Sequence, residues 1–359
     1  MSDYFEVIGI SSKGIRLDNV RKEQGVRVIP VQMSRSISPF KDLIALYKLY
    51  TIFSKEKPFI VHSHTPKAGL LSMMASYFAK VPHRLHTVAG LPLLETTGIK
   101  RRILNVVEKL TYAFSTKVYP NSFGLEKIIL DHNFIDQSKL KVIGNGSSNG
   151  IDLEHFDPNL FSREDNHALR KELNIAENDF VFINVGRMVT DKGINELVEA
   201  FCKIQETFKE TKLLLLGEFE EKLDPLFPET MEKIKNNPNI NYLGWQWDVR
   251  PYFAISNMLA FPSYREGFPN VVMQAGAMGL PSIVSDINGC NEIIINGQNG
   301  CIIPPKSTEH LYNAMVESLK NGTSKFKNVR ESIATRFDRS VIWNAILAEY
   351  DSLTPNQKK

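Results

Sequence analysis

Residues 261–300 read FPSYREGFPNVVMQAGAMGLPSIVSDINGCNEIIINGQNG and are the most informative run of the chain. The apolar segment Met258–Phe261 ends in Pro-Ser, which is typical of a buried strand that stops at a loop. A polar loop follows, then an expected helix over Val271–Met278, a second strand over Ser282–Ser285 and a glycine-containing turn. This order puts backbone N–H groups and one carboxylate at the carboxyl edge of a parallel sheet, where α/β proteins bind ligands. The run therefore predicts half of a binding site.

Short apolar or β-branched segments alternate with helical patterns along the rest of the chain. This alternation is typical of a parallel sheet covered by helices on both faces, so we expect an α/β protein. In the first half we expect strands at Phe5–Ile10, Arg27–Val31, Phe59–Val61, Arg84–Val88, Val118–Tyr119 and Leu140–Ile143, and helices at Ile15–Glu23, Pro39–Lys55, Ala68–Ala79, Lys100–Phe114 and Gly124–Asp131. In the second half we expect strands at Phe180–Val185, Lys212–Leu216, Ile240–Leu243, Met258–Phe261, Ser282–Val284 and Cys301–Ile303, and helices that include Glu164–Leu173, Asn195–Phe208, Thr308–Leu319 and Val341–Tyr350.

A break in the middle of the chain predicts two domains. The glycine-rich run Gly144–Gly150 and the polar segment Asp157–Asn178 interrupt the alternation, and 359 residues suit two doubly wound halves better than one. We expect an N-terminal domain over residues 1–157 and a C-terminal domain over residues 158–335. Residues 336–359 are expected to form a helix that crosses back to the N-terminal domain. A ligand between the two halves fits this architecture.

Composition excludes several classes of protein. The net charge of +3 excludes a strongly basic nucleic-acid binder, and the 43% hydrophobic content allows a sizeable core. The three cysteines show no C-x-x-C spacing and no even disulfide count, which favours a reducing compartment. No apolar run approaches the roughly 20 residues of a membrane span. We therefore expect a cytoplasmic protein.

Two cations follow the first strand of the second half. In the segment Val185–Gly193, a glycine permits a tight turn, and Arg187 and Lys192 lie beside the start of a helix. Positive charge at a helix N-terminus suits a diphosphate. The alternative, a solvated loop with two ordinary surface cations, stays open on this motif alone.

Glu266 lies in the loop of the opening run, where a carboxylate can accept hydrogen bonds from sugar hydroxyls. Residues 267–270 can offer N–H groups, except at Pro269, which has none. The alternative is a helix N-terminal charge favoured by the dipole. The cation-bearing loop nearby favours the binding interpretation.

Three histidines end strands of the first half. His62 and His64 alternate, so both should point to one face, and His86 ends another strand. No acidic or cysteine partner lies at a spacing that supports a metal site, and the sequence has no D-x-D pair. We expect polar cleft-facing or hydrogen-bonded histidines and a metal-independent site.

Two basic, partly apolar helix patterns, Lys41–Lys57 and Lys100–Lys109, could rest on an anionic membrane surface. A core-covering helix with a solvated basic face explains them equally well, and the choice stays open.

With these residues in view, the chain resembles retaining glycosyltransferases of family 4, and the resemblance spans nearly all of it. The family has the GT-B fold of two facing Rossmann-like domains with doubly wound parallel sheets. The segments that carry the resemblance are N-V-G-R-M-V-x-D-K-G (184–193), P-S-Y-R-E-G-F-P-N-V-V (262–272), N-G-C-N-E-I-I (288–294), H-S-H-T-P-K-A-G (62–69) and G-N-G-S-S-N-G-I-D (144–152). The last two look like the subgroup that builds bacterial capsule, O-antigen and lipid-linked oligosaccharides.

The resemblance implies a role for each matching position. Arg187 and Lys192 would hold the donor diphosphate, and Glu266 would contact the donor hexose; these three form the expected catalytic set. Leu243 falls where the family cradles the nucleotide base. The positions implied to bind substrate are Gly186, Leu243, Gly267, Phe268, Asn270 and Gln274.

The sequence departs from the family pattern in three places. Gln274 stands where the family has a glutamate that binds the ribose, and residues 87–90 read T-V-A-G where many members have T-V-H-G. His64 or His86 could substitute for that histidine. The first strand follows Met1–Asp3 directly, without the family's opening strand, glycine loop and helix. We therefore expect an incomplete N-terminal sheet.

The resemblance, together with the charged residues at the sheet edge, implies a hexosyltransferase that uses a nucleotide-diphosphate sugar, a UDP-sugar in our interpretation, and no other cofactor. The acceptor is expected to be a glycan or a lipid-linked saccharide of cell-surface polysaccharide synthesis. The enzyme would work in the cytoplasm, or peripherally on the inner face of the cytoplasmic membrane, without nucleic acid. Two alternatives stay open: a truncated, weakly active or inactive sugar-nucleotide binder, and a nucleotide-sugar epimerase of the same fold.

Overall fold

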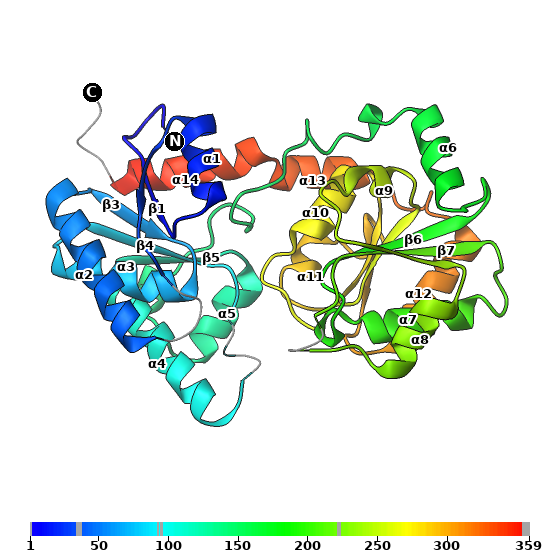
Figure 1. Cartoon of the computed structure of the whole chain (residues 1–359), viewed down its shortest axis with the longest axis horizontal. Helices are drawn as coiled ribbons and strands as arrows, with labels where there is room; N and C mark the ends of the chain where they lie inside the picture. The colour runs from blue at the N-terminus through cyan, green and yellow to red at the C-terminus, as the bar shows by residue number, and fades with distance from the viewer. Residues whose placement is uncertain (1, 34–37, 92, 94–95, 221–223, 354–359) are drawn as a thin grey trace. The chain divides into compact units, whose positions relative to one another are not determined.

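The computed structural model describes residues 2–33, 38–91, 93, 96–220 and 224–353 (Figure 1). The chain forms two compact units. The N-terminal unit comprises Met1–Asn121, Leu125–Gly144 and Asn344–Lys359, and the C-terminal unit comprises Ser122–Gly124 and Asn145–Trp343. The chain passes between them inside the glycine-rich run, earlier than the division expected after residue 157, and it returns to the N-terminal unit within its last helix.

The C-terminal unit is built on a six-stranded parallel sheet in the order β11-β10-β9-β6-β7-β8. The first of these strands in the chain, β6, lies in the middle and pairs with β7 on one side and β9 on the other. The chain order reverses between β6 and β9, which makes that place the topological switch point of a doubly wound sheet. The strands are β6 Phe180–Val185, β7 Thr211–Leu216, β8 Ile240–Gly244, β9 Met258–Phe261, β10 Ser282–Ser285 and β11 Gly300–Ile303.

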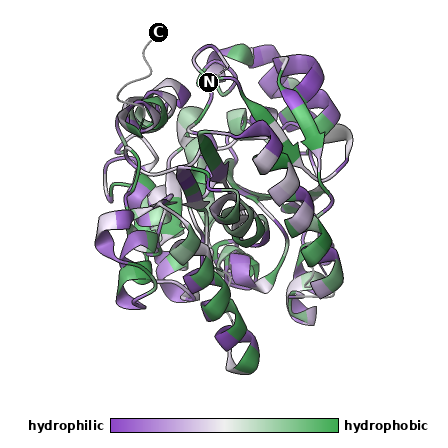
Figure 2. Cartoon of the chain, turned by 90° about the vertical axis from the view of Figure 1, so that its left-hand side faces the viewer, coloured by the Kyte–Doolittle hydropathy of each residue, from purple (hydrophilic) through white to green (hydrophobic). Residues whose placement is uncertain are grey.

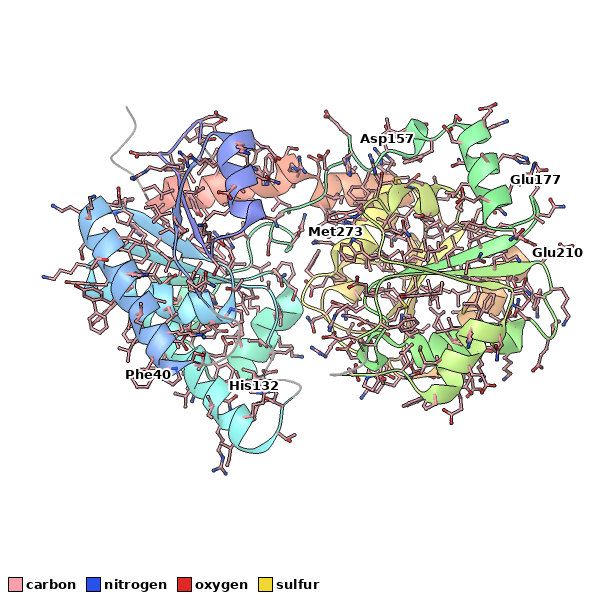
Figure 3. The ribbon with its side chains drawn as sticks, in the orientation of Figure 1. Phe40, His132, Asp157, Glu177, Glu210 and Met273 are labelled. Atoms are coloured by element: carbon pink, nitrogen blue, oxygen red, sulfur yellow. The ribbon has the colours of Figure 1, made fainter. Side chains whose placement is uncertain are left out.

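Helices cover both faces of this sheet. Side chains alternate along β6, so Phe182 joins one apolar cluster with Leu197, while Val181 and Ile183 join the other with Met273. Met273 is labelled within this unit in Figure 3. The helices are α6 Arg163–Glu172, α7 Ile194–Ile204, α8 Pro228–Asn236, α9 Arg250–Ala254, α10 Asn270–Ala277, α11 Cys290–Ile293, α12 Thr308–Asn321 and α13 Val329–Phe337.

In the N-terminal unit, the described strands form two separate parallel sheets, β1-β2 and β3-β4-β5, rather than one. The strand expected at Leu140–Ile143 is wrong. Only Leu140 makes a bridge, to Val118, and Gly144 then turns the chain away with a positive φ of 58°. The strands are β1 Ile8–Ser11, β2 Arg27–Pro30, β3 Ile60–Ser63, β4 His83–Val88 and β5 Lys117–Pro120, and the helices are α1 Ile15–Gln24, α2 Pro39–Glu56, α3 Pro66–Phe78, α4 Gly98–Phe114, α5 Phe123–Asp131 and α14 Arg339–Leu353.

The two faces of the β3-β4-β5 sheet have different covers. Leu85 and Tyr119 pack against the C-terminal part of α14. On the other face the ring of His86 lies against α3, where Gly69 leaves it room: a Cβ on Gly69 would lie 2.4 Å from Cε1 of His86. The sheet is therefore held between α14 and the α2–α4 helices.

Replacing Gly69 with alanine should destabilise the N-terminal unit. Alanine favours a helix by about 1 kcal/mol over glycine, but overpacking against the buried imidazole should cost about 1–3 kcal/mol. We expect a net fall in the thermal-unfolding midpoint. In a His86→Ala background, which vacates the space, Gly69→Ala should cost nothing or stabilise the protein. An equal loss in both backgrounds would contradict this packing.

Candidate active site

The loops that leave β6 and β9 lie side by side at the switch point of the C-terminal sheet. The first loop runs through the 3₁₀ turn Thr190–Lys192 to Gly193, where α7 begins. Gly193 has a φ of 70°, and a Cβ there would lie 2.1 Å from the carbonyl oxygen of Pro262 in the second loop. Only glycine allows the two loops to approach this closely.

Lys192 and Glu266 form an ion pair between these loops. The Nζ of Lys192 lies 2.5 Å from Oε1 of Glu266, and the two side chains are only 15% and 17% exposed. The hydroxyl of Ser263 donates to the same carboxylate oxygen over 3.0 Å. The sequence placed both charged residues at one sheet edge, and the structure brings them into direct contact.

Further contacts tie the two loops together. Arg265 pairs with Asp191 over 2.5 Å, and the N–H of Tyr264 donates to the carbonyl of Asp191 over 2.8 Å. The hydroxyl of Tyr264 donates to Glu196 on α7 over 2.5 Å. Burial, followed by the bond to Glu196, raises the pKa of Tyr264, and burial also raises the pKa of the Asp191 carboxyl. Sequence reasoning missed these residues, although Asp191, Tyr264 and Arg265 lie inside the motifs.

Arg187 lies on the same loop as Lys192 but pairs elsewhere. Its guanidinium contacts the carboxylate of Glu220, and its side chain remains 52% exposed. Gly186 faces open space within the described residues, while Gly217 packs so tightly that a Cβ would lie 1.8 Å from the carbonyl oxygen of Gly186. The exposed guanidinium and the open glycine leave this side of the loop accessible to a ligand.

The turn after β10 holds the backbone of the Glu266 loop in place. The side-chain amide of Asn288 donates to the carbonyl oxygens of Glu266 and, over 3.2 Å, of Gly267. Gly289 has a φ of 77°, and a Cβ there would lie 2.4 Å from the Gly267 oxygen. The N-G turn therefore fixes the backbone that carries the carboxylate.

The other expected binding residues of the C-terminal unit lie in varied surroundings. The ring of Phe268 is buried against Phe337, with centroids 5.3 Å apart, so it is not free for a ligand. Asn270 begins α10 and is exposed, and Gln274 is half-buried one turn later. Leu243 lies near the end of β8, partly buried on the core.

The structure separates His64 from His86. The rings of His62 and His64 stack with centroids 4.3 Å apart, as expected for one face, and His64 is exposed. His86 points to the other face, is 2% exposed and lies 2.8 Å from the hydroxyl of Ser63. Burial, with a smaller effect of His64, lowers the pKa of His86 to about 4. His86 is therefore closed to a substrate here, contrary to its expected binding role.

Within the described part of the chain, no three His, Cys, Asp or Glu side chains lie close enough together to hold a metal ion. None of the helices in the described ranges has the length and apolar composition needed to cross a membrane.

The carboxyl edge of the C-terminal sheet carries two kinds of ligand-binding group. Lys192, Arg187 and the N-terminus of α7, which has no side-chain cap, offer positive charge and N–H donors to an anion. Glu266 offers an acceptor for hydroxyl groups. The arrangement suits a ligand that carries both a diphosphate and sugar hydroxyls.

Comparison with known proteins agrees with this chemistry. Residues 165–336 match the family model "Glycosyl transferases group 1", and residues 1–122 match "Glycosyl transferase 4-like". The chain is 34% identical to the capsular polysaccharide biosynthesis glycosyltransferase CapM of Staphylococcus aureus, covering 96% of this chain and 89% of CapM. It is 30% identical to an Escherichia coli UDP-Gal:alpha-D-GlcNAc-diphosphoundecaprenol alpha-1,3-galactosyltransferase, covering 85% of this chain and 78% of that enzyme.

Solved structures of other proteins are similar to this one. The structure of Anabaena HepE in complex with UDP and glucose matches with a TM-score of 0.76 and 21% identity, covering 93% of this chain and 89% of HepE. The lipopolysaccharide glycosyltransferase WaaG matches with a TM-score of 0.72 and 15% identity, covering 97% of this chain and all of WaaG. The chain therefore belongs to the family-4 glycosyltransferases and has the GT-B fold.

Replacing Asn288 with alanine should loosen the Glu266 loop. Two carbonyl oxygens lose their donor, which should cost about 1 kcal/mol of stability, and the displaced carboxylate should lower kcat/KM for sugar transfer about tenfold. Asn291→Ala is the matched control, because the side-chain amide of Asn291 donates to the exposed Asp286 in the same turn instead of to the Glu266 loop. Equal activity of the two variants would show that Asn288 does not position the site.

Proposed function

We propose that this glycosyltransferase moves a hexose from a UDP-sugar to a glycan or lipid-linked acceptor of cell-surface polysaccharide synthesis, retaining the anomeric configuration. The observation that carries the proposal is the Lys192–Glu266 pair at the switch point. The two curated relatives support it, because one is a capsular polysaccharide biosynthesis glycosyltransferase and the name of the other specifies a UDP-sugar and a diphosphoundecaprenol acceptor.

Donor binding would exchange one partner of Lys192 for another. In the unliganded protein its ammonium group is matched by Glu266, and Arg187 is matched by Glu220. A diphosphate offers both cations a more highly charged partner. Once released from Lys192, Glu266 would accept hydrogen bonds from hexose hydroxyls. Gln274 would pair with the ribose as an uncharged partner, and the base would lie near Leu243.

The same groups define the chemistry. Negative charge develops on the UDP oxygens as the bond to the anomeric carbon breaks, and Lys192 and Arg187 would stabilise it. The departing phosphate oxygen would take the proton of the acceptor hydroxyl as that hydroxyl forms the new bond. Since two cations meet the phosphate charge, we propose a metal-independent reaction.

Removing either cation should weaken donor use. Lys192→Ala and Arg187→Ala should each lower kcat/KM for a UDP-hexose about 100-fold, because the transition-state charge loses a fixed partner. Lys320→Ala, which removes an exposed lysine on α12, is the control. Transfer by the parent enzyme should persist in excess EDTA. Parent-like kinetics in both site variants would refute the diphosphate assignment.

We also propose that the N-terminal unit touches an anionic membrane surface through α2. Ala45, Leu49 and Phe53 bury one face of this helix. The opposite face exposes a contiguous apolar stripe and carries, along one side, lysines spaced seven residues apart. The stripe consists of Phe40, Leu43, Ile44 and Tyr47, and the lysines are Lys41, Lys48 and Lys55.

The figures place the start of α2 and show the hydropathy of this side of the N-terminal unit. Phe40, which is 86% exposed, lies at the surface at the start of α2 in Figure 3. Figure 2 shows green apolar segments beside purple ones on the helices of the N-terminal unit that face the viewer. Exposed apolar stripes of this kind mark surfaces that bind a membrane or another protein.

Helix α4 repeats the pattern, and α3 packs against both helices. Tyr112 and Thr111 bury one side of α4. Its other side exposes Ile99, Ile103, Val106 and Leu110, with Arg102 and Lys109 exposed along the edge. Apolar stripes bordered by cations match an anionic lipid surface, where a cation contributes about 1 kcal/mol. A core-covering role accounts only for the buried faces.

Polar substitutions in the α2 stripe should reduce vesicle binding. Leu43→Ser/Tyr47→Ser should weaken sedimentation with phosphatidylglycerol vesicles about tenfold or more, since two apolar side chains leave the interface. Leu160→Ser removes an exposed leucine from the C-terminal unit and serves as the control. Binding that is unchanged in the double variant, or equal on neutral phosphatidylcholine vesicles, would contradict the membrane assignment.

A further inference from the structure

The last helix packs on the strands that carry the stacked histidines. Residues 344–353 of α14 belong to the N-terminal unit. Ile346 and Tyr350 lie against Leu85 and Tyr119 of the β3-β4-β5 sheet. Figure 1 shows α14 in red beside this unit. The contact places polar atoms of the helix next to the end of β3.

Tyr350 fixes the imidazole of His62. Its hydroxyl lies 2.5 Å from Nδ1 of His62, and the hydroxyl of Thr87 lies 2.7 Å from Nε2. Both ring nitrogens are therefore engaged, from opposite sides. Burial, with smaller effects of His64 and His86, lowers the pKa of His62 well below its usual value. A neutral imidazole with two hydroxyl partners has one defined position and tilt.

Glu349, the neighbour of Tyr350, anchors the same helix through partners other than His62. Its carboxylate accepts the hydroxyl of Tyr119 over 3.0 Å and pairs with Lys141. Glu349 is buried, so it is a strong attachment of α14 to the sheet. The helix thus has one anchor that bonds the His62 ring directly and one that bonds the hydroxyl of Tyr119, whose ring lies 5.8 Å from the ring of His62 between centroids. Glutamine at position 349 can still accept the Tyr119 hydroxyl, so Glu349→Gln leaves that ring contact in place.

His62 in turn supports His64. The two rings stack at an angle of 28°. His64 is exposed, just beyond β3 and before α3 begins at Pro66, at the carboxyl edge of its sheet. The conformation of the His64 ring therefore depends on the His62 ring against which it stacks, and the position of the His62 ring depends on Tyr350.

We infer that Tyr350 is a positioning residue for the acceptor: through His62 it orients His64, whose imidazole hydrogen-bonds an acceptor hydroxyl. The inference rests on the proposed function. The donor-site residues all belong to the C-terminal unit, which leaves the acceptor as the substrate for an exposed polar group at the edge of the N-terminal sheet. An imidazole can donate to or accept from a sugar hydroxyl, as this role needs.

Tyr350→Phe tests the inference, because it removes only the hydroxyl and keeps the ring. With UDP-galactose and a polyprenyl-diphosphate GlcNAc as probes, the variant should raise the acceptor KM about three- to tenfold, as expected for one neutral hydrogen bond, with an unchanged donor KM. Glu349→Gln, the matched control, should lower Tm at least as much and leave the acceptor KM unchanged. Matching acceptor kinetics in the two variants would overturn the inference.

A double-mutant cycle locates the effect. The change caused by Tyr350→Phe should vanish in a His64→Ala background, because the hydroxyl acts only through that ring. An effect that persists in full would overturn the positioning role.

An NMR experiment separates this inference from the proposed function, since it needs no substrate. In protein with ¹³C-labelled histidine rings, Tyr350→Phe should shift the His64 signal, assigned with His64→Ala, and Glu349→Gln should leave it in place. An unmoved His64 signal in Tyr350→Phe refutes the inference even if transfer is normal. A shifted signal with no transfer by the parent enzyme would refute the proposed function alone.

Discussion

The ion pair between Lys192 and Glu266 is the interaction on which the site depends. It joins the loops after β6 and β9, which meet because the sheet order reverses between those strands. Glycines make the approach possible, at Gly193 between the two loops and at Gly289 beneath the second. Both charges are largely shielded from water, so a ligand that displaces one of them must offer charge in return.

The rest of the C-terminal unit holds the strands that carry this ion pair, and the N-terminal unit carries separate polar and apolar surfaces. In the C-terminal unit, apolar clusters on both faces of the sheet hold the strands from which the loops emerge. In the N-terminal unit, α14 and α3 hold the sheet that carries His62 and His64, while α2 and α4 turn apolar stripes outward. The proposed roles in phosphate binding, acceptor contact and membrane contact thus fall on different elements, each with its own charge pattern.

Much of this could be predicted from sequence, and the failures have physical causes. The strands expected at Phe180–Val185 and Met258–Phe261 are confirmed as β6 and β9. Strands buried on both faces of a parallel sheet are nearly continuous apolar runs, which makes them recognisable in the sequence. Leu140–Ile143 has the same local character but lacks a partner beyond one bridge. The motifs placed Lys192 and Glu266 at one edge. That Asp191 meets Arg265, or Tyr350 meets His62, depends on tertiary packing that no spacing reveals.

The most direct test is a structure of the protein with a UDP-hexose bound. We expect the diphosphate within hydrogen-bonding distance of Lys192 Nζ at the start of α7, with a hexose hydroxyl on Glu266 in place of the ammonium group. A donor bound elsewhere, with the Lys192–Glu266 pair intact, would contradict the assignment of this site.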